Sequence, residues 1–97
     1  MKHYRQGDLY ITEVVSIPKG LEEQTNGIIL RGEATGHKHQ LKGGEVLKGK
    51  DLIFLNVPAN AEIVHEEHNT IKLSRGKYAV IRQREYTNAD ATRLVVD

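Results

Sequence analysis

Hydrophobic positions in this sequence form short runs that glycine and other turn residues interrupt at close intervals, without a long helical period. Such runs, rich in Val, Ile and Leu, are typical of short β-strands. Segment 51–57 is almost continuously apolar, which predicts a strand buried on both faces. Segment 21–24 has room for one helical turn, and segment 88–91 for a loop or one helical turn. The predicted strands are 8–15, 27–31, 35–41, 45–48, 51–57, 61–65, 70–73, 77–86 and 92–96.

Turn signals separate these runs, notably Asn26-Gly27, Gly43-Gly44, the bend at 58–60 and the turn at 74–76. So many short strands in 97 residues predict an all-β fold, a small barrel or a two-sheet sandwich of about eight short strands. No repeat or linker divides the sequence, so we expect one domain spanning residues 1–97.

Composition narrows the class of protein. The chain has no Trp, one Phe and four Tyr, so its core must be small and aliphatic, and a homo-oligomer that buries more surface is expected. The formal net charge of +1 excludes a polycationic tail and argues against tight binding of long nucleic acid. A small anionic ligand or a nucleotide stays open as a partner.

The absence of cysteine excludes disulfides, thiolate metal sites and a cysteine nucleophile. The N-terminal residues lack the apolar stretch of a signal peptide, and no segment approaches the roughly 20 apolar residues that span a bilayer. We therefore expect a cytoplasmic protein without membrane contact, from a bacterial-type cell or a phage that infects one.

Four of the five histidines stand in two pairs, Gly36-His37-Lys38-His39 and His65-Glu66-Glu67-His68. His37 and His39 share one face if their segment is a strand, because side chains two positions apart point the same way. His65 ends a predicted strand, and a tight turn brings His68 near it. Each pair thus lies at a strand end, where a small barrel can place the two pairs opposite each other.

Neutral imidazole binds zinc, manganese and iron, so we predict a divalent-metal site formed by His37, His39, His65 and His68. Three such ligands with an open position suit metal-assisted hydrolysis of an anionic small molecule. Glu66 and Glu67 are candidates for a carboxylate ligand or a general base. Whether the protein is an enzyme stays open at this point.

A metal-free alternative uses opposed histidines as acid and base to cleave a nucleotide or RNA phosphodiester. In this alternative as in the metal-binding one, Arg82 and Arg84 are the candidates for holding an anionic substrate, on a strand face that also carries Tyr78 and Tyr86 for stacking on a base. A third reading is a non-catalytic binding or assembly module of phage type, in which the histidines only make structural contacts.

The pattern Gly32-x4-His37-x-His39-x5-Glu45-x3-Gly49, followed by Pro58 and His65, resembles the two motifs of the cupins. The resemblance covers residues 32–68 and implies a small β-barrel in which His37, His39, Glu45 and His65 bind a metal. The spacings depart from the family pattern at several points, and the glycine expected after Pro58 is absent.

A longer pattern also resembles short bacterial and phage proteins of unassigned role. It combines Gly36-His37-x-His39, His65-Glu66-Glu67-His68 and Gln83-Arg84-Glu85-Tyr86 and covers most of the chain. That resemblance implies that these residues belong to one unit, and it brings no activity with it.

Overall fold

The protein is an all-β domain, which confirms the predicted fold class. The computed structural model describes residues 2–32 and 36–82, and within them it contains eight strands and no helix. The strands are β1 (His3–Gln6), β2 (Leu9–Val14), β3 (Glu22–Glu23), β4 (Ile28–Arg31), β5 (Lys38–Lys42), β6 (Glu45–Gly49), β7 (Leu52–Val64) and β8 (Ile71–Arg82).

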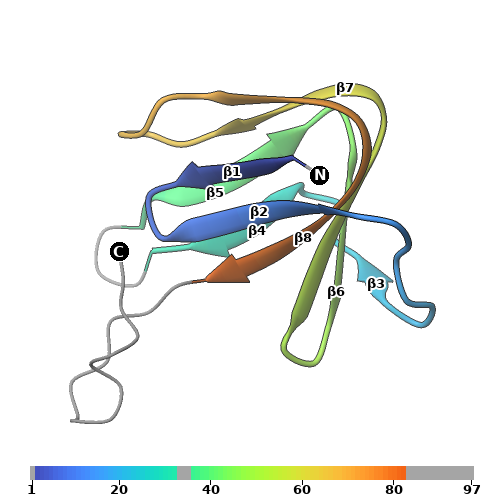
Figure 1. Cartoon of the computed structure of the whole chain (residues 1–97). Coiled ribbons are helices and arrows are strands. Elements are labelled where there is room, and N and C mark those ends of the chain that lie inside the picture. Colours follow the sequence, from blue (N-terminus) through green and yellow to red (C-terminus); the bar gives the residue numbers. More distant parts are fainter. Residues whose placement is uncertain (1, 33–35, 83–97) are drawn as a thin grey trace, which may run out of the picture.

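All strand pairs are antiparallel, and they form one curved sheet in the order β1-β2-β8-β7-β5-β4. The short strands β6 and β3 continue the sheet beside the first half of β7. The sheet does not close into a barrel, because within residues 2–32 and 36–82 no pairing joins the end strands β1 and β4. Figure 1 shows how the long strands β7 and β8 arch over, so that β1 and β2 face β4 and β5.

The sequence analysis predicted four shorter strands, separated by bends at 58–60 and 74–76, in place of β7 and β8. That prediction was wrong. Both strands continue through these positions, and the ladder changes register between Val57 and Asn60. Gly76 lies opposite Val57 at that irregularity, and its positive φ of 157° is one that residues with a side chain rarely adopt. Pro58 and Gly76 therefore mark the point where one long hairpin bends, not the ends of strands.

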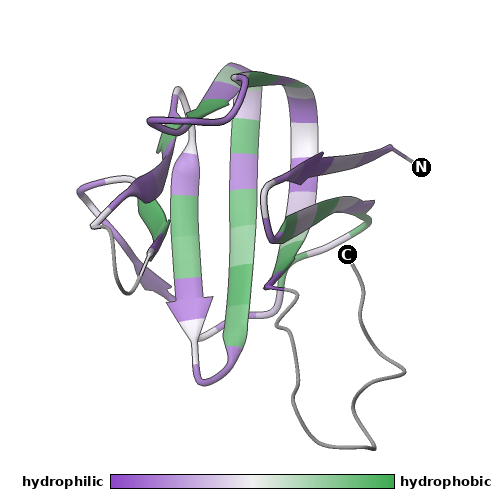
Figure 2. Ribbon diagram, turned by 90° about the vertical axis from the view of Figure 1, so that its left-hand side faces the viewer, coloured by the Kyte–Doolittle hydropathy of each residue, from purple (hydrophilic) through white to green (hydrophobic). Residues whose placement is uncertain are grey.

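Alternate side chains on the strands fill the core inside this bend. Figure 2 shows the hydrophobic segments of the long strands. In β7, Leu55 and Val57 are buried while Leu52 is 44% exposed. The prediction that segment 51–57 is buried on both faces was therefore wrong. Its outward residues belong to the outer side of the curved sheet. The core consists of Leu9, Ile11, Ile29, Leu41, Val46, Leu55, Val57, Ala61, Ile63, Leu73, Tyr78 and Val80.

Two smaller predictions also need correction. The helical turn expected at 21–24 is the short strand β3, which pairs with β6. The strand expected from residue 8 is preceded by a separate strand, β1, and the turn Gly7-Asp8 joins the two. The predicted segments 88–91 and 92–96 lie outside the described residues. No helix among the described residues has the length and apolar character needed to cross a membrane.

Candidate functional site: a histidine cluster at the end of the long hairpin

Two neighbouring strands bring the two histidine pairs together. His37 directly precedes β5 and His39 lies within it, while His65 directly follows β7. His68 belongs to the loop between β7 and β8. Because β5 and β7 are antiparallel with Gln40 opposite Val64, the start of β5 lies beside the end of β7. The register thus places side chains that are about 28 positions apart in sequence at one end of the sheet.

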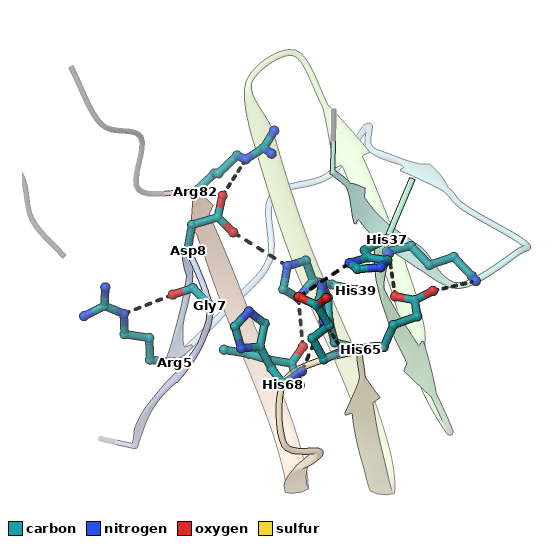
Figure 3. Close-up of polar contacts among 12 residues, drawn as sticks. Arg5, Gly7, Asp8, His37, His39, His65, His68 and Arg82 are labelled. Carbon is teal, nitrogen blue, oxygen red and sulfur yellow. Dashed lines mark hydrogen bonds and ion pairs between the residues drawn. The ribbon is translucent and has the colours of Figure 1, made fainter. Parts of the chain in front are cut away.

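His65 is the centre of the cluster (Figure 3). Its ring centroid lies 4.4 Å from that of His39, 4.6 Å from that of His68 and 5.5 Å from that of His37. The rings of His39 and His68 are stacked at 6.4 Å. All four predicted histidines therefore form one continuous set of ring contacts, which we call the histidine cluster. The remaining histidine, His3, lies on β1 with its Nδ1 3.3 Å from the hydroxyl of Thr12.

His39 is the most deeply buried member, and Gln6 determines which of its ring nitrogens carries the proton. Gln6 is 2% exposed, and its amide nitrogen donates to the carbonyls of Ile63 (2.9 Å) and Asn69 (2.8 Å). Its amide oxygen lies 2.8 Å from Nδ1 of His39 and must accept a hydrogen bond there. Neutral His39 therefore carries its proton on Nδ1 and keeps a lone pair on Nε2.

A carboxylate faces that lone pair. Asp8 Oδ1 lies 3.6 Å from Nε2 of His39, and Asp8 Oδ2 accepts a 2.9 Å hydrogen bond from Nε of Arg82. Burial alone would raise the pKa of Asp8, but the hydrogen bond and charge of Arg82 outweigh it and lower that pKa. Arg82, predicted to hold an anionic substrate, is thus already paired with an ionised carboxylate beside the histidine cluster.

His65 has the opposite tautomer to His39. Its Nδ1 accepts hydrogen bonds from the backbone N–H groups of Glu67 (3.0 Å) and His68 (3.3 Å). A nitrogen that accepts two such bonds carries no proton, so neutral His65 has its proton on Nε2. The same two bonds close the loop between β7 and β8 and hold His68 against the cluster.

The imidazoles of His39 and His65 are neutral at neutral pH. Burial, followed by the charge that His65 would carry, lowers the pKa of His39 to about 4, although Asp8 opposes this effect. Burial and the neighbouring His68 also lower the pKa of His65. Desolvation and mutual repulsion both disfavour a charged ring here, which keeps lone pairs available for a metal ion or a proton.

The two predicted carboxylates occupy different positions around the cluster. Glu66 accepts hydrogen bonds from the backbone N–H of Lys38 (2.9 Å) and from its ammonium group (3.4 Å). These contacts, the backbone bond first, lower the pKa of Glu66 to about 2, so it is ionised. Glu67 is more exposed, and its carboxylate lies 3.8 Å from Nδ1 of His37.

One group of donor atoms is close enough together to suggest a shared ion. One ligand atom from each of His37, His65 and Glu66 lies within 4.8 Å of the others. Two ligands of one zinc ion are at most about 4.2 Å apart, since each bond is about 2.1 Å, so modest side-chain movement would complete the site. This set is part of the predicted one. His39 and His68 touch His65 but are outside this group.

Other residues singled out from the sequence lie elsewhere. Glu45, the additional ligand implied by the cupin resemblance, pairs across the sheet with Asn56 and accepts a 3.0 Å bond from its amide. Among the described residues, no hydrogen bond or ion pair joins Glu45 to the histidine cluster. Tyr78 is fully buried and donates to the carbonyl of Ser74, so the prediction that it stacks on a base was wrong. Arg84 lies outside the described residues.

Sequence reasoning missed Gln6 and Asp8. Neither residue belongs to a local motif, and both reach His39 only because β1 and β2 fold over the sheet. The one local signal was the Gly7-Asp8 turn, which separates β1 from β2.

Comparison with known proteins places the chain in a family. No curated protein and no solved structure matches it. A family model does match residues 5–83, a span that includes the four clustered histidines, Gln6, Asp8 and Arg82. The chain therefore belongs to the family described as Domain of unknown function (DUF8820).

Proposed function

We propose that the protein binds a divalent transition-metal ion, such as zinc, manganese or iron(II), at the histidine cluster. His37, His65 and Glu66 are the proposed ligands. The observation that carries the proposal is the grouping of their donor atoms within 4.8 Å. An ionised carboxylate with two imidazoles is a donor set that suits these ions and leaves a position open for water or substrate.

His39 supports the same proposal. Histidines that bind metals usually donate their other ring N–H to a fixed acceptor, which orients the ring. Gln6 is such an acceptor for Nδ1, and it leaves Nε2 of His39 unprotonated beside Asp8. His39 is therefore the proposed additional ligand if the ion lies deeper in the cluster. Arg82 would then hold an anionic substrate of metal-assisted hydrolysis.

The tautomer and hydrogen bonds of His65 limit how this residue can bind a metal. Its Nδ1 already accepts two backbone hydrogen bonds, so ligation through Nε2 requires the ring proton to move to Nδ1, and ligation through Nδ1 requires the ring to give up both bonds. In either case the backbone N–H groups of Glu67 and His68 lose their acceptor. Metal binding should therefore change the amide chemical shifts of Glu67 and His68.

The test is elemental analysis and calorimetric titration of the untagged protein with zinc, manganese and iron(II). We expect close to one ion per chain in the wild type and loss of binding in a His37→Ala/His65→Ala variant. His3→Ala is the matched control, because His3 lies outside the histidine cluster, and it should bind like the wild type. A wild type that takes up no metal, or a double variant that keeps it, would overturn the proposal.

A second candidate function rests on the opposite tautomers of His39 and His65. With rings 4.4 Å apart, one offers a lone pair and the other a proton on Nε2, as general base and general acid would. This arrangement favours metal-independent phosphodiester cleavage over a purely structural role. Cleavage of bis(p-nitrophenyl) phosphate that resists chelator and is lost in both His39→Ala and His65→Ala would support it. If the protein neither binds a metal nor cleaves the phosphodiester, the non-catalytic binding module is the remaining candidate function.

A further inference from the structure

A cavity of about 610 Å³ lies away from the proposed metal ligands, where the C-terminal end of β8 meets β6 and the start of β7. Leu30, Ile53 and Val80 give it an apolar lining, and Lys48, Arg82 and Asp51 supply its charges. Leu30 and Ile53 pack against the core, so this apolar lining is continuous with the protein interior.

Lys48 is the unusual residue of this cavity. Its side chain is partly buried, and burial, followed by repulsion from Arg31, lowers its pKa. Among residues 2–32 and 36–82, no side chain forms a hydrogen bond or ion pair with its ammonium group. Asp51 lines the same cavity without forming such a pair. A partly desolvated cation beside a second cation, without an anionic partner, is unfavourable unless an anion binds there.

Arg82 has N–H donors at the same cavity that its contact with Asp8 does not use. It uses Nε for Asp8, and its terminal nitrogens point away from that carboxylate in Figure 3. A guanidinium group has five N–H donors, so a second acceptor can be bound without breaking the Asp8 contact. Arg82 thus borders both the cavity and the histidine cluster.

We propose that this cavity binds a small organic monoanion whose charged group lies between Lys48 and Arg82 and whose apolar body packs on Leu30, Ile53 and Val80. Three cations, Lys48, Arg31 and Arg82, against the carboxylates of Asp51 and Asp8 leave one net positive charge, which favours one negative charge on the ligand. The volume accommodates an aromatic or branched aliphatic carboxylate. The inference goes beyond metal binding and does not depend on it.

The experiment is a titration of the ¹⁵N-labelled protein with 2-naphthoate, followed by amide chemical shifts. We expect saturable shifts at Gly49, Ile53 and Val80. Lys48→Gln should weaken binding about tenfold, since a hydrogen bond to a charged group is lost. Lys48→Arg, which keeps the charge, should bind within about threefold of the wild type. Lys42→Gln, which removes an exposed lysine outside the cavity, should leave binding unchanged.

Two further ligands separate charge from apolar contact. Neutral 2-naphthol and inorganic phosphate should both bind more weakly than 2-naphthoate, because each lacks one of the two features. The proposal is overturned if 2-naphthoate gives no saturable shifts up to about 10 mM, where even millimolar affinity is visible. Equal affinities for 2-naphthol and 2-naphthoate, or equal weakening by Lys42→Gln and Lys48→Gln, would also overturn it. Binding should persist in the His37→Ala/His65→Ala variant, which distinguishes this site from the metal site.

Discussion

The amide oxygen of Gln6 accepts a 2.8 Å hydrogen bond from Nδ1 of His39, which lies 33 positions away in the sequence. The same Gln6 amide group donates to the backbone carbonyls of Ile63 and Asn69. One buried side chain thus ties β1 to β5, to β7 and to the loop after it. It also dictates that His39 keeps an unprotonated Nε2, which faces Asp8.

Replacing Gln6 should affect both the stability of the fold and the tautomer of His39. Gln6→Leu leaves two backbone carbonyls and one ring N–H without a partner, and we expect a loss of about 2–3 kcal/mol in the free energy of unfolding. Chemical denaturation measures this loss. The ¹⁵N shifts of the His39 ring should change from a single protonated Nδ1 to a mixture of tautomers. Gln24→Leu, in a more exposed glutamine, is the control and should cost less than about 0.5 kcal/mol.

The stability of the metal-free protein should fall as the pH drops from about 6.5 towards 4. In the unfolded chain His39 takes up a proton near its ordinary pKa of 6.5, whereas burial lowers that pKa to about 4 in the folded protein. The unfolded state therefore binds more protons throughout this window, and the free energy of unfolding decreases with decreasing pH. His39 contributes at most about 3 kcal/mol to the change. The lowered pKa of His65 acts in the same direction.

Denaturation curves in the presence of chelator at pH 7.5 and pH 5 measure this effect. In this pH range the carboxyl groups of Glu66 and Asp8 are mostly ionised in both the folded and the unfolded state. In the folded protein their pKa values are lowered further. His39→Gln should reduce the pH dependence, and His3→Gln should retain it. If His39→Gln retains the full pH dependence, burial of this imidazole is not its cause.

Local patterns in the sequence were sufficient to predict the fold class and the histidine pairs. Alternation and glycine spacing identified most strands, and the i, i+2 spacing of His37 and His39 predicted one shared face. The bends near Pro58 and Gly76 were misread as strand ends. Those residues lie close to each other across the β7–β8 ladder, and only the paired structure shows that both strands bend together.

The surroundings of the histidine cluster could not be predicted in this way. The contact of Gln6 with His39 depends on how β1 folds over the sheet, and no short-range spacing encodes it. The burial of Tyr78 follows from which side of β8 faces the core. Both are long-range consequences of strand order, which hydrophobic periodicity leaves undetermined.

The role of Glu66 can be separated from that of the neighbouring Lys38. The stronger of the two contacts that hold Glu66 comes from the backbone N–H of Lys38, which a side-chain substitution retains. Lys38→Ala should therefore change metal affinity by less than about threefold, as expected for an exposed charge pair. Glu66→Gln should weaken binding about tenfold or more, because a charged ligand is removed. Calorimetric titration with zinc compares the two, and equal effects would contradict Glu66 as a ligand.

Gly7 should be sensitive to a methyl group, because the His68 side chain lies directly over it. A Cβ atom at Gly7 would lie 2.7 Å from Nε2 and 2.9 Å from Cδ2 of His68. Gly20 also has a positive φ, but a Cβ there would meet nothing within 4 Å. Both Gly→Ala substitutions should cost about 1 kcal/mol for the left-handed backbone. Gly7→Ala should cost more, because it also displaces His68 from the cluster.

A double-mutant cycle measures this additional cost. In a His68→Ala background the clash is absent, so Gly7→Ala should destabilise the protein only as much as Gly20→Ala does. In the wild-type background Gly7→Ala should also shift the ring signals of His65 and His39, since His68 contacts both rings. An identical cost of Gly7→Ala in the two backgrounds would show that His68 does not pack over the Gly7 turn. The cluster would then contain His37, His39 and His65 alone.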